Sequence, residues 1–152
     1  MSAVTEQPVI PLTADEEALL RALRQVMFGL PRALDADLVR EQRITLTEYT
    51  TLMHLSEAPH RMMRMSELAT ANELSLSGMT RLVTRMEERG YIQRTKCPED
   101  ARGWNAVLTD AGLARLEEAW PTHLRSVRKH VFGHFEGFDL ARLAAALSAV
   151  AR

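Results

Sequence analysis

The 152-residue sequence lacks several features on which large classes of proteins depend. Its single cysteine, Cys97, excludes an internal disulfide framework. No stretch approaches the ~20 consecutive apolar residues that a membrane-spanning helix needs. Residues 1–12 lack the basic segment followed by an apolar run that marks a secretion signal. These absences predict a protein of the cytoplasm.

Signatures of catalysis are also missing from the sequence. The seven glycines are scattered along the chain and form no phosphate-binding loop. The pair Ser77-Gly78 does not belong to a nucleophile elbow. We therefore expect neither an enzyme nor a bound cofactor.

Aromatic residues are few, at 5% of the chain, and the net charge is only −1. A chain of this length forms one domain with a real core, and its wealth of aliphatic residues suits a mainly helical protein. The charge is unevenly distributed, because residues 61–102 carry eight Lys or Arg against six Asp or Glu, whereas residues 1–60 carry five against nine. Binding to a polyanion would therefore depend on a few well-placed arginines.

Residues 66–109 are the most informative part of the chain. The stretch that begins at Ser66 predicts a short helix, with the Ser66 hydroxyl as its cap. The stretch Ser75–Arg89 predicts a second helix, which Gly90 ends in a left-handed conformation. Two short helices in this order are typical of a helix-turn-helix.

A β-hairpin is predicted directly after these helices. Residues 91–95 and 105–108 predict its two strands, and the polar stretch Lys96–Gly103 predicts the turn between them. Thr109 predicts the cap of the next helix. A helix-turn-helix followed by such a hairpin is a winged helix, a fold that most often binds double-stranded DNA.

The second short helix has two different faces. One is apolar at helical spacing and predicts a buried stripe, formed by Leu76, Met79, Leu82, Val83 and Met86. The other is polar and consists of Ser77, Arg81, Thr84, Arg85 and Glu88. Small side chains let a helix N-terminus approach phosphate, and arginine can bridge guanine acceptors or clamp a phosphate. The alternative interpretation is an ordinary solvated helix face.

Three segments carry a resemblance to a known family: Met79–Val83, Glu88–Ile92 and above all Glu99–Gly103, which is followed by Val107-Leu108-Thr109 and then Ala111-Gly112. On these segments residues 66–109, and in weaker form the whole chain, resemble the MarR (multiple antibiotic resistance regulator) family. A lone Asp-x-Arg-Gly is a weak signal, but at this distance after a recognition-type helix it is specific.

The family implies a mainly α fold with a small β-hairpin wing, in which one domain spans residues 1–152. In that architecture residues 45–109 form the winged helix-turn-helix, and residues 12–43 and 110–152 form dimerisation helices. The family also implies a homodimeric regulator of transcription that binds double-stranded DNA, usually as a repressor, and is often released by a small effector or an oxidant.

The resemblance further implies roles for individual residues. The DNA-binding residues would be Ser75, Ser77, Gly78, Thr80, Arg81, Thr84 and Arg85 on the recognition helix, with Lys96 and Arg102 on the wing. Arg102 would enter the minor groove. Asp100 would brace the wing against the hairpin backbone or an arginine of the recognition helix.

Apolar stripes at helical spacing flank the winged helix in sequence. One runs from Leu19 to Leu38, a second from Leu113 to Val131 and a third from Leu140 to Val150. We expect Pro31 to kink or break the first helix and Pro121 to bend the second. A winged helix alone does not need so much additional apolar surface, so these helices favour a homodimer on a pseudo-palindromic operator.

Three further sites are left open by the sequence. Effectors in this family usually lie between the dimer helices and the DNA-binding lobe, where the nearest candidates are Met27, Met53, His54, Trp120 and His123. His130 and His134 would share a metal only on a continuous helix, and surface histidines without a metal are favoured. Cys97 in the wing is either an exposed oxidation switch or an incidental loop cysteine, and the second is favoured.

The sequence therefore predicts a regulator that inserts the Ser75–Arg89 helix in the major groove and the Lys96–Trp104 wing in the adjacent minor groove. The alternatives are a metal sensor built on His130 and His134, and a winged helix used for contacts with other proteins. The polar recognition face argues against the latter, which would need an apolar one.

Overall fold

The computed structural model describes residues 9–151, so most of the segment considered for a secretion signal lies outside it. The elements follow one another as α1 (Ala14–Gln42), α2 (Leu46–Glu57), η1 (Pro59–Arg61), β1 (Met62–Arg64), α3 (Met65–Ala71), α4 (Leu76–Glu88), β2 (Ile92–Cys97), β3 (Asp100–Leu108), α5 (Asp110–His130), η2 (Phe132–His134) and α6 (Leu140–Val150). The expected fold is confirmed: helices dominate, and a small antiparallel sheet forms the wing. None of the described helices is long and apolar enough to cross a membrane.

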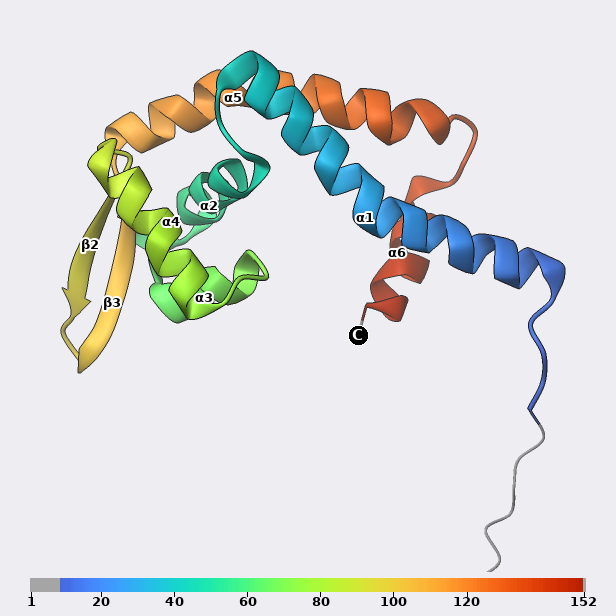
Figure 1. Ribbon diagram of the computed structural model, residues 1–152, viewed down its shortest axis with the longest axis horizontal. Coiled ribbons are helices and arrows are strands. Elements are labelled where there is room, and N and C mark those ends of the chain that lie inside the picture. Colours follow the sequence, from blue (N-terminus) through green and yellow to red (C-terminus); the bar gives the residue numbers. More distant parts are fainter. Residues whose placement is uncertain (1–8, 152) are drawn as a thin grey trace, which may run out of the picture.

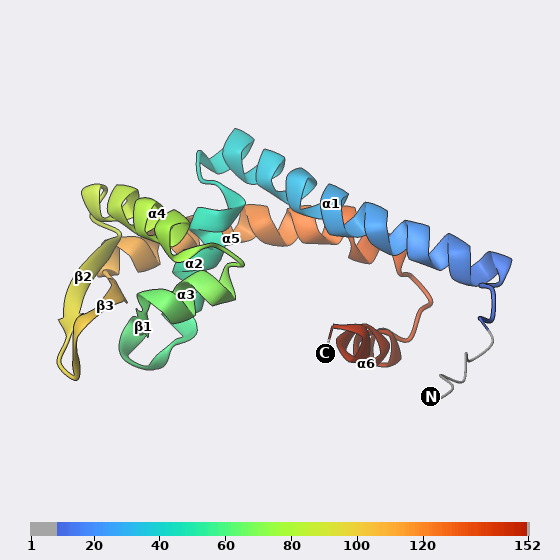
Figure 2. The ribbon, with the colours of Figure 1, turned by 60° about the horizontal axis from the view of Figure 1, so that its bottom comes forward.

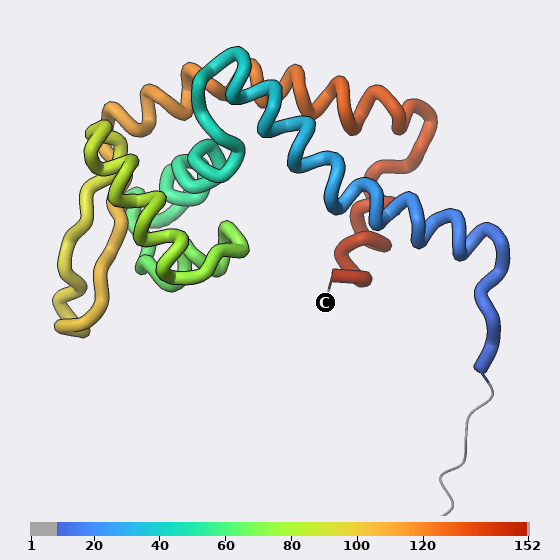
Figure 3. Tube along the Cα trace, in the orientation of Figure 1, coloured from blue at the N-terminus to red at the C-terminus, as the bar shows by residue number. Residues whose placement is uncertain are grey.

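The elements separate into a lobe and an arm (Figure 1). Helices α2, α3 and α4 and the β2–β3 hairpin gather at one end, whereas α1 and α5 run from this lobe toward the other end. After the end of α5 the chain turns back, and α6 lies on the arm side of the molecule, apart from the lobe. Figure 2 keeps the same separation after rotation, and the trace in Figure 3 shows how far the hairpin stands out from the lobe.

Side-chain caps start helices α2, α4, α5 and α6. Thr45 and Ser75 accept hydrogen bonds from the backbone N–H three residues on, at the starts of α2 and α4. Thr109 and Asp139 do the same for α5 and α6. Each cap satisfies a backbone donor that has no partner inside the helix.

The hydrophobic core lies inside the lobe. Its fully buried side chains include Leu38, Leu52, Leu55, Leu68, Met79, Val83, Met86 and Ile92. They come from α1, α2, α3, α4 and β2, and α5 adds Leu116 and Ala119. The core thereby fixes the position of α4 relative to the hairpin.

Of the kink or break predicted at Pro31, the break does not occur, because α1 is continuous from Ala14 to Gln42. Helix α5, in which a bend at Pro121 was predicted, is also continuous through that residue. A proline removes one backbone hydrogen bond, and the remaining bonds of a long, well-capped helix hold it together. A reciprocal capping box at Thr13 and Glu16 starts α1.

Helix α3 begins at Met65, so the prediction that Ser66 caps it is wrong. The reason is a third strand, β1, which the sequence analysis missed. Met62 pairs with Val107 and Arg64 with Asn105, so β1 adds to the outer edge of β3. This pairing fixes the direction in which the chain enters α3, and Arg64 occupies the capping position.

The hairpin strands are longer than predicted, and the turn is shorter. Pairing runs from Ile92–Leu108 to Lys96–Trp104 and ends with Cys97 opposite Asp100. The turn is therefore confined to residues 98–99 instead of spanning 96–103. The outer hairpin is exposed to solvent, so its strands lack the apolar alternation that reveals a half-buried strand.

Candidate nucleic-acid interface

Helix α4 presents the polar face that the sequence predicts. Met79, Leu82, Val83 and Met86 are buried, while Ser77, Arg81 and Arg85 are exposed and Thr84 is half-buried. The prediction that Leu76 belongs to the buried stripe is wrong, because this residue is 55% exposed. It lies in the first turn of α4, close to the wing, where no element covers it.

The hydroxyl groups on this face are engaged within the helix. The Ser75 hydroxyl accepts from the Gly78 N–H at 3.1 Å. The Thr80 and Thr84 hydroxyls donate to backbone carbonyls four residues earlier, at 2.8 Å each. The Thr80 and Thr84 protons are therefore used inside the helix. The Ser75 and Ser77 hydroxyls lie 3.2 Å apart, so one hydrogen bond between them leaves one hydroxyl proton for an external acceptor.

Arg81 and Arg85 lie on the exposed surface of α4, one turn apart. Both line a wide hollow of about 570 Å³ between α4, α1 and the start of α2. The ion pairs of this helix among residues 9–151 involve Glu87 instead. The two guanidinium groups are therefore available to an external anion.

The wing tip is shaped by Asp100. Its Oδ1 accepts a hydrogen bond from the Arg102 backbone N–H at 3.0 Å. A side chain at Gly103 would crowd the Asp100 carboxylate, at 3.2 Å. Within residues 9–151, Asp100 bonds the hairpin backbone and makes no ion pair with Arg81 or Arg85.

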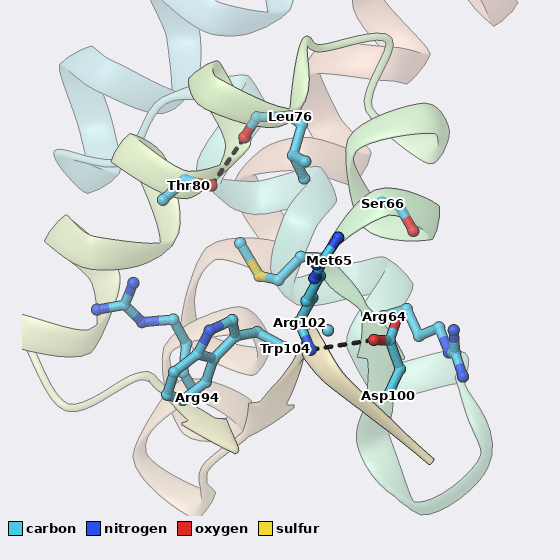
Figure 4. A pocket seen from close by; sticks show the side chains of 10 residues that line it. Arg64, Met65, Ser66, Leu76, Thr80, Arg94, Asp100, Arg102 and Trp104 are labelled. Atoms are coloured by element: carbon cyan, nitrogen blue, oxygen red, sulfur yellow. Dashed lines mark hydrogen bonds between the residues drawn. The ribbon is translucent and has the colours of Figure 1, made fainter. Parts of the chain in front are cut away.

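A hollow of about 270 Å³ separates the wing from the starts of α3 and α4 (Figure 4). We call it the wing hollow, and it is lined by Arg64, Met65, Ser66, Leu76, Thr80, Arg94, Asp100, Arg102, Gly103 and Trp104. The predicted Thr80, Asp100 and Arg102 meet here. Trp104 is 44% exposed, and the Lys96 ammonium lies 5.7 Å from its ring centroid, within range of a cation–π contact.

Arg64, Arg94 and Trp104 were missed by the sequence analysis. A signal for Arg94 existed, because the period of a strand places it on the same face as the buried Ile92. A charged residue on a core-facing side needs a partner, and Arg94 Nε donates to Glu87 Oε2 at 2.7 Å. This ion pair joins the first wing strand to the last turn of α4.

The residues expected to form an effector pocket do not all meet. Met53 and Trp120 line a cavity of about 280 Å³ between α2 and α5, together with Tyr49 and Leu116. His54 lines a different hollow, and Met27 is 68% exposed on α1. These two residues are therefore separate from the cavity.

His123 lies beside that cavity through its contact with Tyr49. The two rings stack with centroids 4.4 Å apart. Its Nδ1 is buried and has no hydrogen-bond partner in the described part of the chain. Burial lowers the pKa of His123, because the charged form loses solvation.

His130 and His134 do not share a continuous helix, since α5 ends at His130 and His134 lies in η2. His130 Nε2 instead bonds Asp37 Oδ2 at 2.9 Å. Asp37 also accepts from Ser126 at 2.7 Å and from Arg40, and these partners hold the pKa of its carboxyl far below the usual range. No group of three metal-ligating side chains occurs within residues 9–151.

Cys97 is only 8% exposed, so the exposure expected of a wing cysteine is wrong. The strand pairing shifts register between Lys96 and Cys97. Such an irregularity changes the face to which the next side chain points. Cys97 therefore points inward, where an oxidant has little access.

Comparisons with known proteins agree with this geometry. The sequence profile of the MarR family matches residues 44–103. The Streptomyces coelicolor regulator AbsC is 36% identical with a TM-score of 0.82, and the match covers 94% of this chain and 96% of that one. Sco3205 from the same organism, solved in complex with DNA, is 33% identical with a TM-score of 0.83, over 94% and 90% of the two chains.

Curated relatives match over shorter stretches. The transcriptional repressor MprA of Escherichia coli is 30% identical over 84 residues, which are 55% of this chain and 48% of that protein. The repressor MdtR of Bacillus subtilis is 30% identical over 107 residues, or 70% of this chain and 65% of that protein. The match thus spans less than two thirds of the length of either relative. The profile and the two full-length structural relatives together identify the chain as a member of the MarR family of transcriptional regulators.

Proposed function

We propose that this protein is a transcriptional repressor that binds a pseudo-palindromic operator as a homodimer. The observation that carries the proposal is the exposed face of α4, where Arg81 and Arg85 are free to contact an anion, next to a wing that bears Arg102 near its tip. Helix α4 would enter the major groove, and Arg102 the adjacent minor groove. Its DNA target places the protein in the cytoplasm.

The chemistry of these residues supports DNA as the partner. Arginine contacts two acceptors on a guanine edge or a phosphate, and arginine is also favoured in narrow, A·T-rich minor grooves. The small residues Ser75, Ser77 and Gly78 allow the N-terminus of α4 to approach a phosphate closely. A relative of 33% identity was solved with DNA, and two curated relatives carry the name repressor.

Apolar side chains left uncovered on the arm support the homodimer. Large hydrophobic residues are exposed on α1, α5 and α6, among them Leu19, Leu20, Val26, Phe28, Trp120, Leu124, Leu140, Leu147 and Val150. No described residue of α6 is buried, although its composition is strongly apolar. Apolar surface of this extent is stabilised by a partner, and a two-fold dimer matches a two-fold operator with half-sites about 10 base pairs apart.

Selection of DNA fragments by the purified protein, followed by sequencing, tests the proposal. We expect an inverted repeat, and light scattering should give twice the chain mass. Arg81→Ala and Arg85→Ala should each weaken binding to that operator, by roughly 1–3 kcal/mol where the arginine reads a base. Arg21→Ala, on the exposed surface of α1, is the matched control and should bind as the wild type does.

If both α4 variants bind the operator and a scrambled duplex as tightly as the wild type does, α4 is excluded as the recognition element. A monomer with undiminished operator binding would exclude the dimer. A protein that selects no sequence at all would refute the proposed function as a whole.

The cavity between α2 and α5 is our candidate for an effector site. Trp120 and Met53 form an apolar wall of this cavity, which has about the size of a small aromatic compound. The nearby His123 Nδ1 lacks a hydrogen-bond partner among the described residues. Effector binding there should quench Trp120 fluorescence and weaken operator binding, and Met53→Trp should abolish both effects. An effector that acts equally on this variant would place the site elsewhere.

A further inference from the structure

We propose that the wing hollow binds the DNA sugar–phosphate backbone, with Arg94 and Arg64 as phosphate ligands and Glu87 as the residue that positions Arg94. The inference rests on the proposed DNA-binding function. It assigns a role to three residues that lie outside both the recognition face and the wing tip.

The argument begins with the path of the DNA. If α4 lies in a major groove and Arg102 in the adjacent minor groove, one strand must pass between them, because a sugar–phosphate backbone separates the two grooves. The space between α4 and the wing is the wing hollow. Each strand carries one negative charge per about 3.4 Å along the axis, so phosphates necessarily come to this hollow.

The lining of the hollow suits a sugar–phosphate backbone. Figure 4 shows Arg94 and Arg64 on opposite sides, with Trp104 and Arg102 between them. Arginine bonds phosphate through paired N–H groups, and the Trp104 indole N–H is a further donor. Leu76 and Met65 add apolar surface, which suits the carbon atoms of deoxyribose. The unexpected exposure of Leu76 thereby acquires a reason.

Arg94 is held in a way that leaves its outer nitrogens free. Its Nε donates to Glu87 Oε2 at 2.7 Å, and no hydrogen bond within residues 9–151 engages its Nη atoms. Glu87 does not line the hollow, so it supports Arg94 from behind. A guanidinium anchored through Nε loses less conformational freedom when its Nη groups bind a phosphate.

Arg64 is tied less tightly. Its guanidinium lies 3.9 Å from Glu99, beyond hydrogen-bonding distance, and the Glu99 side chain is 87% exposed. Among residues 9–151, Asp100 is the only carboxylate that lines the hollow, and it is engaged by the Arg102 backbone N–H. The surfaces facing into the hollow thus carry three arginines against one occupied carboxylate.

The test uses the selected operator carrying single methylphosphonate linkages, which lack the phosphate charge, placed in turn at each position of a half-site. Wild-type protein should lose about tenfold in affinity at one or two positions between the two contacted grooves. On the unmodified operator, Arg94→Gln should lose as much affinity as the wild type loses on the methylphosphonate. The variant should lose no further affinity when the methylphosphonate replaces the phosphate that Arg94 contacts. Arg64→Gln should behave likewise at a neighbouring position.

Salt dependence gives an independent readout. Loss of one phosphate contact lowers the slope of log affinity against log salt by about 0.9, so a fourfold rise in salt weakens either variant about 3.5-fold less than the wild type. Arg21→Gln is the matched control, and it should keep both the slope and the methylphosphonate profile of the wild type.

Glu87→Gln separates positioning from charge. If Glu87 were only a negative charge near DNA, its removal would strengthen binding at every position. Because Glu87 positions Arg94, we expect Glu87→Gln to bind the unmodified operator more weakly than the wild type does. This loss of affinity should be absent when the methylphosphonate stands at the Arg94 position. It should also be absent in the Arg94→Gln background. Melting temperatures of the variants near that of the wild type exclude a folding defect.

Retention of the wild-type salt slope and methylphosphonate profile by Arg94→Gln would overturn this proposal while leaving the proposed function intact. A gain of affinity in Glu87→Gln would overturn the positioning role. If the wild type selects no operator, the proposed function itself fails, and the two failures are therefore distinguishable.

Discussion

Replacement of Asp37 by alanine should destabilise the fold strongly, although the residue is not among the proposed DNA contacts. Asp37 is 6% exposed and joins α1 to α5 through Ser126 and His130, and it also bonds Arg40 one turn along α1. Removal of one member of a buried charged cluster costs about 3–5 kcal/mol, since the remaining partners stay desolvated. The Arg40 side chain is 60% exposed and contributes little, so we expect a loss of about 3 kcal/mol.

The effect should depend on pH in a defined direction. The pKa of Asp37 is lower in the folded protein than in the unfolded chain, where it is about 3.9. The folded state therefore gains stability above pH 4 and loses it as the pH falls further. Asp37→Asn cannot ionise. Its free energy of unfolding should therefore differ from that of the wild type by a constant amount above pH 5 and by a smaller amount below pH 4.

Urea denaturation at one fixed protein concentration measures both effects, because the stability of the proposed dimer would depend on concentration. Asp110→Asn is the matched control, since its fully exposed carboxylate pairs with Arg61 at 3.0 Å and should change stability by less than about 0.5 kcal/mol. Equal midpoints for the Asp37 and Asp110 variants would refute the reasoning that the α1–α5 cluster stabilises the fold.

Four further outcomes are expected. Arg102→Ala should weaken operator binding more on A·T-rich than on G·C-rich flanks while leaving the melting temperature unchanged, and fluorescence anisotropy on both duplexes decides this. Gly112→Ala should cost about 3 kcal/mol in urea denaturation, because a Cβ there would lie 2.2 Å from the Tyr91 carbonyl oxygen. Cys97→Ser should lower the free energy of unfolding by about 1 kcal/mol, because it buries a hydroxyl group. Mild peroxide should impair operator binding by the variant and the wild type to the same degree. Loss of binding by the wild type alone would establish a redox role. Because the pKa of His123 is lowered by burial, stability should fall as the pH drops below 6.5, and His123→Phe should reduce that dependence.

Local sequence signals were enough to predict α4 and the start of α5. The caps at Ser75 and Thr109 each need only a hydroxyl near a free N–H three residues away. The apolar spacing of Met79 to Met86 needs only the period of the helix. Such signals depend on neighbours in sequence, so one sequence suffices to read them.

Contacts between distant segments escaped prediction for the same reason. Strand β1 has only three residues, too few to show a period, and exists because β3 pairs with it. The inward direction of Cys97 follows from a register shift against β3 rather than from its neighbours. Asp37 and Ser126 are 89 positions apart, so their hydrogen bond left no local pattern.

The arrangement of α5 explains how an event on the arm can reach the DNA-binding lobe. The Thr109 hydroxyl donates to the Gly90 carbonyl oxygen at 2.6 Å, just after α4, and Gly112 has no room for a side chain against Tyr91. The start of α5 is therefore fixed to the end of α4, while its far end is joined to α1 through Asp37. Since α5 is continuous between these points, we expect a change in its tilt to displace α4 and the wing together. In the proposed two-fold dimer that displacement would change the distance between the two recognition helices, which has to match the half-site spacing of the operator.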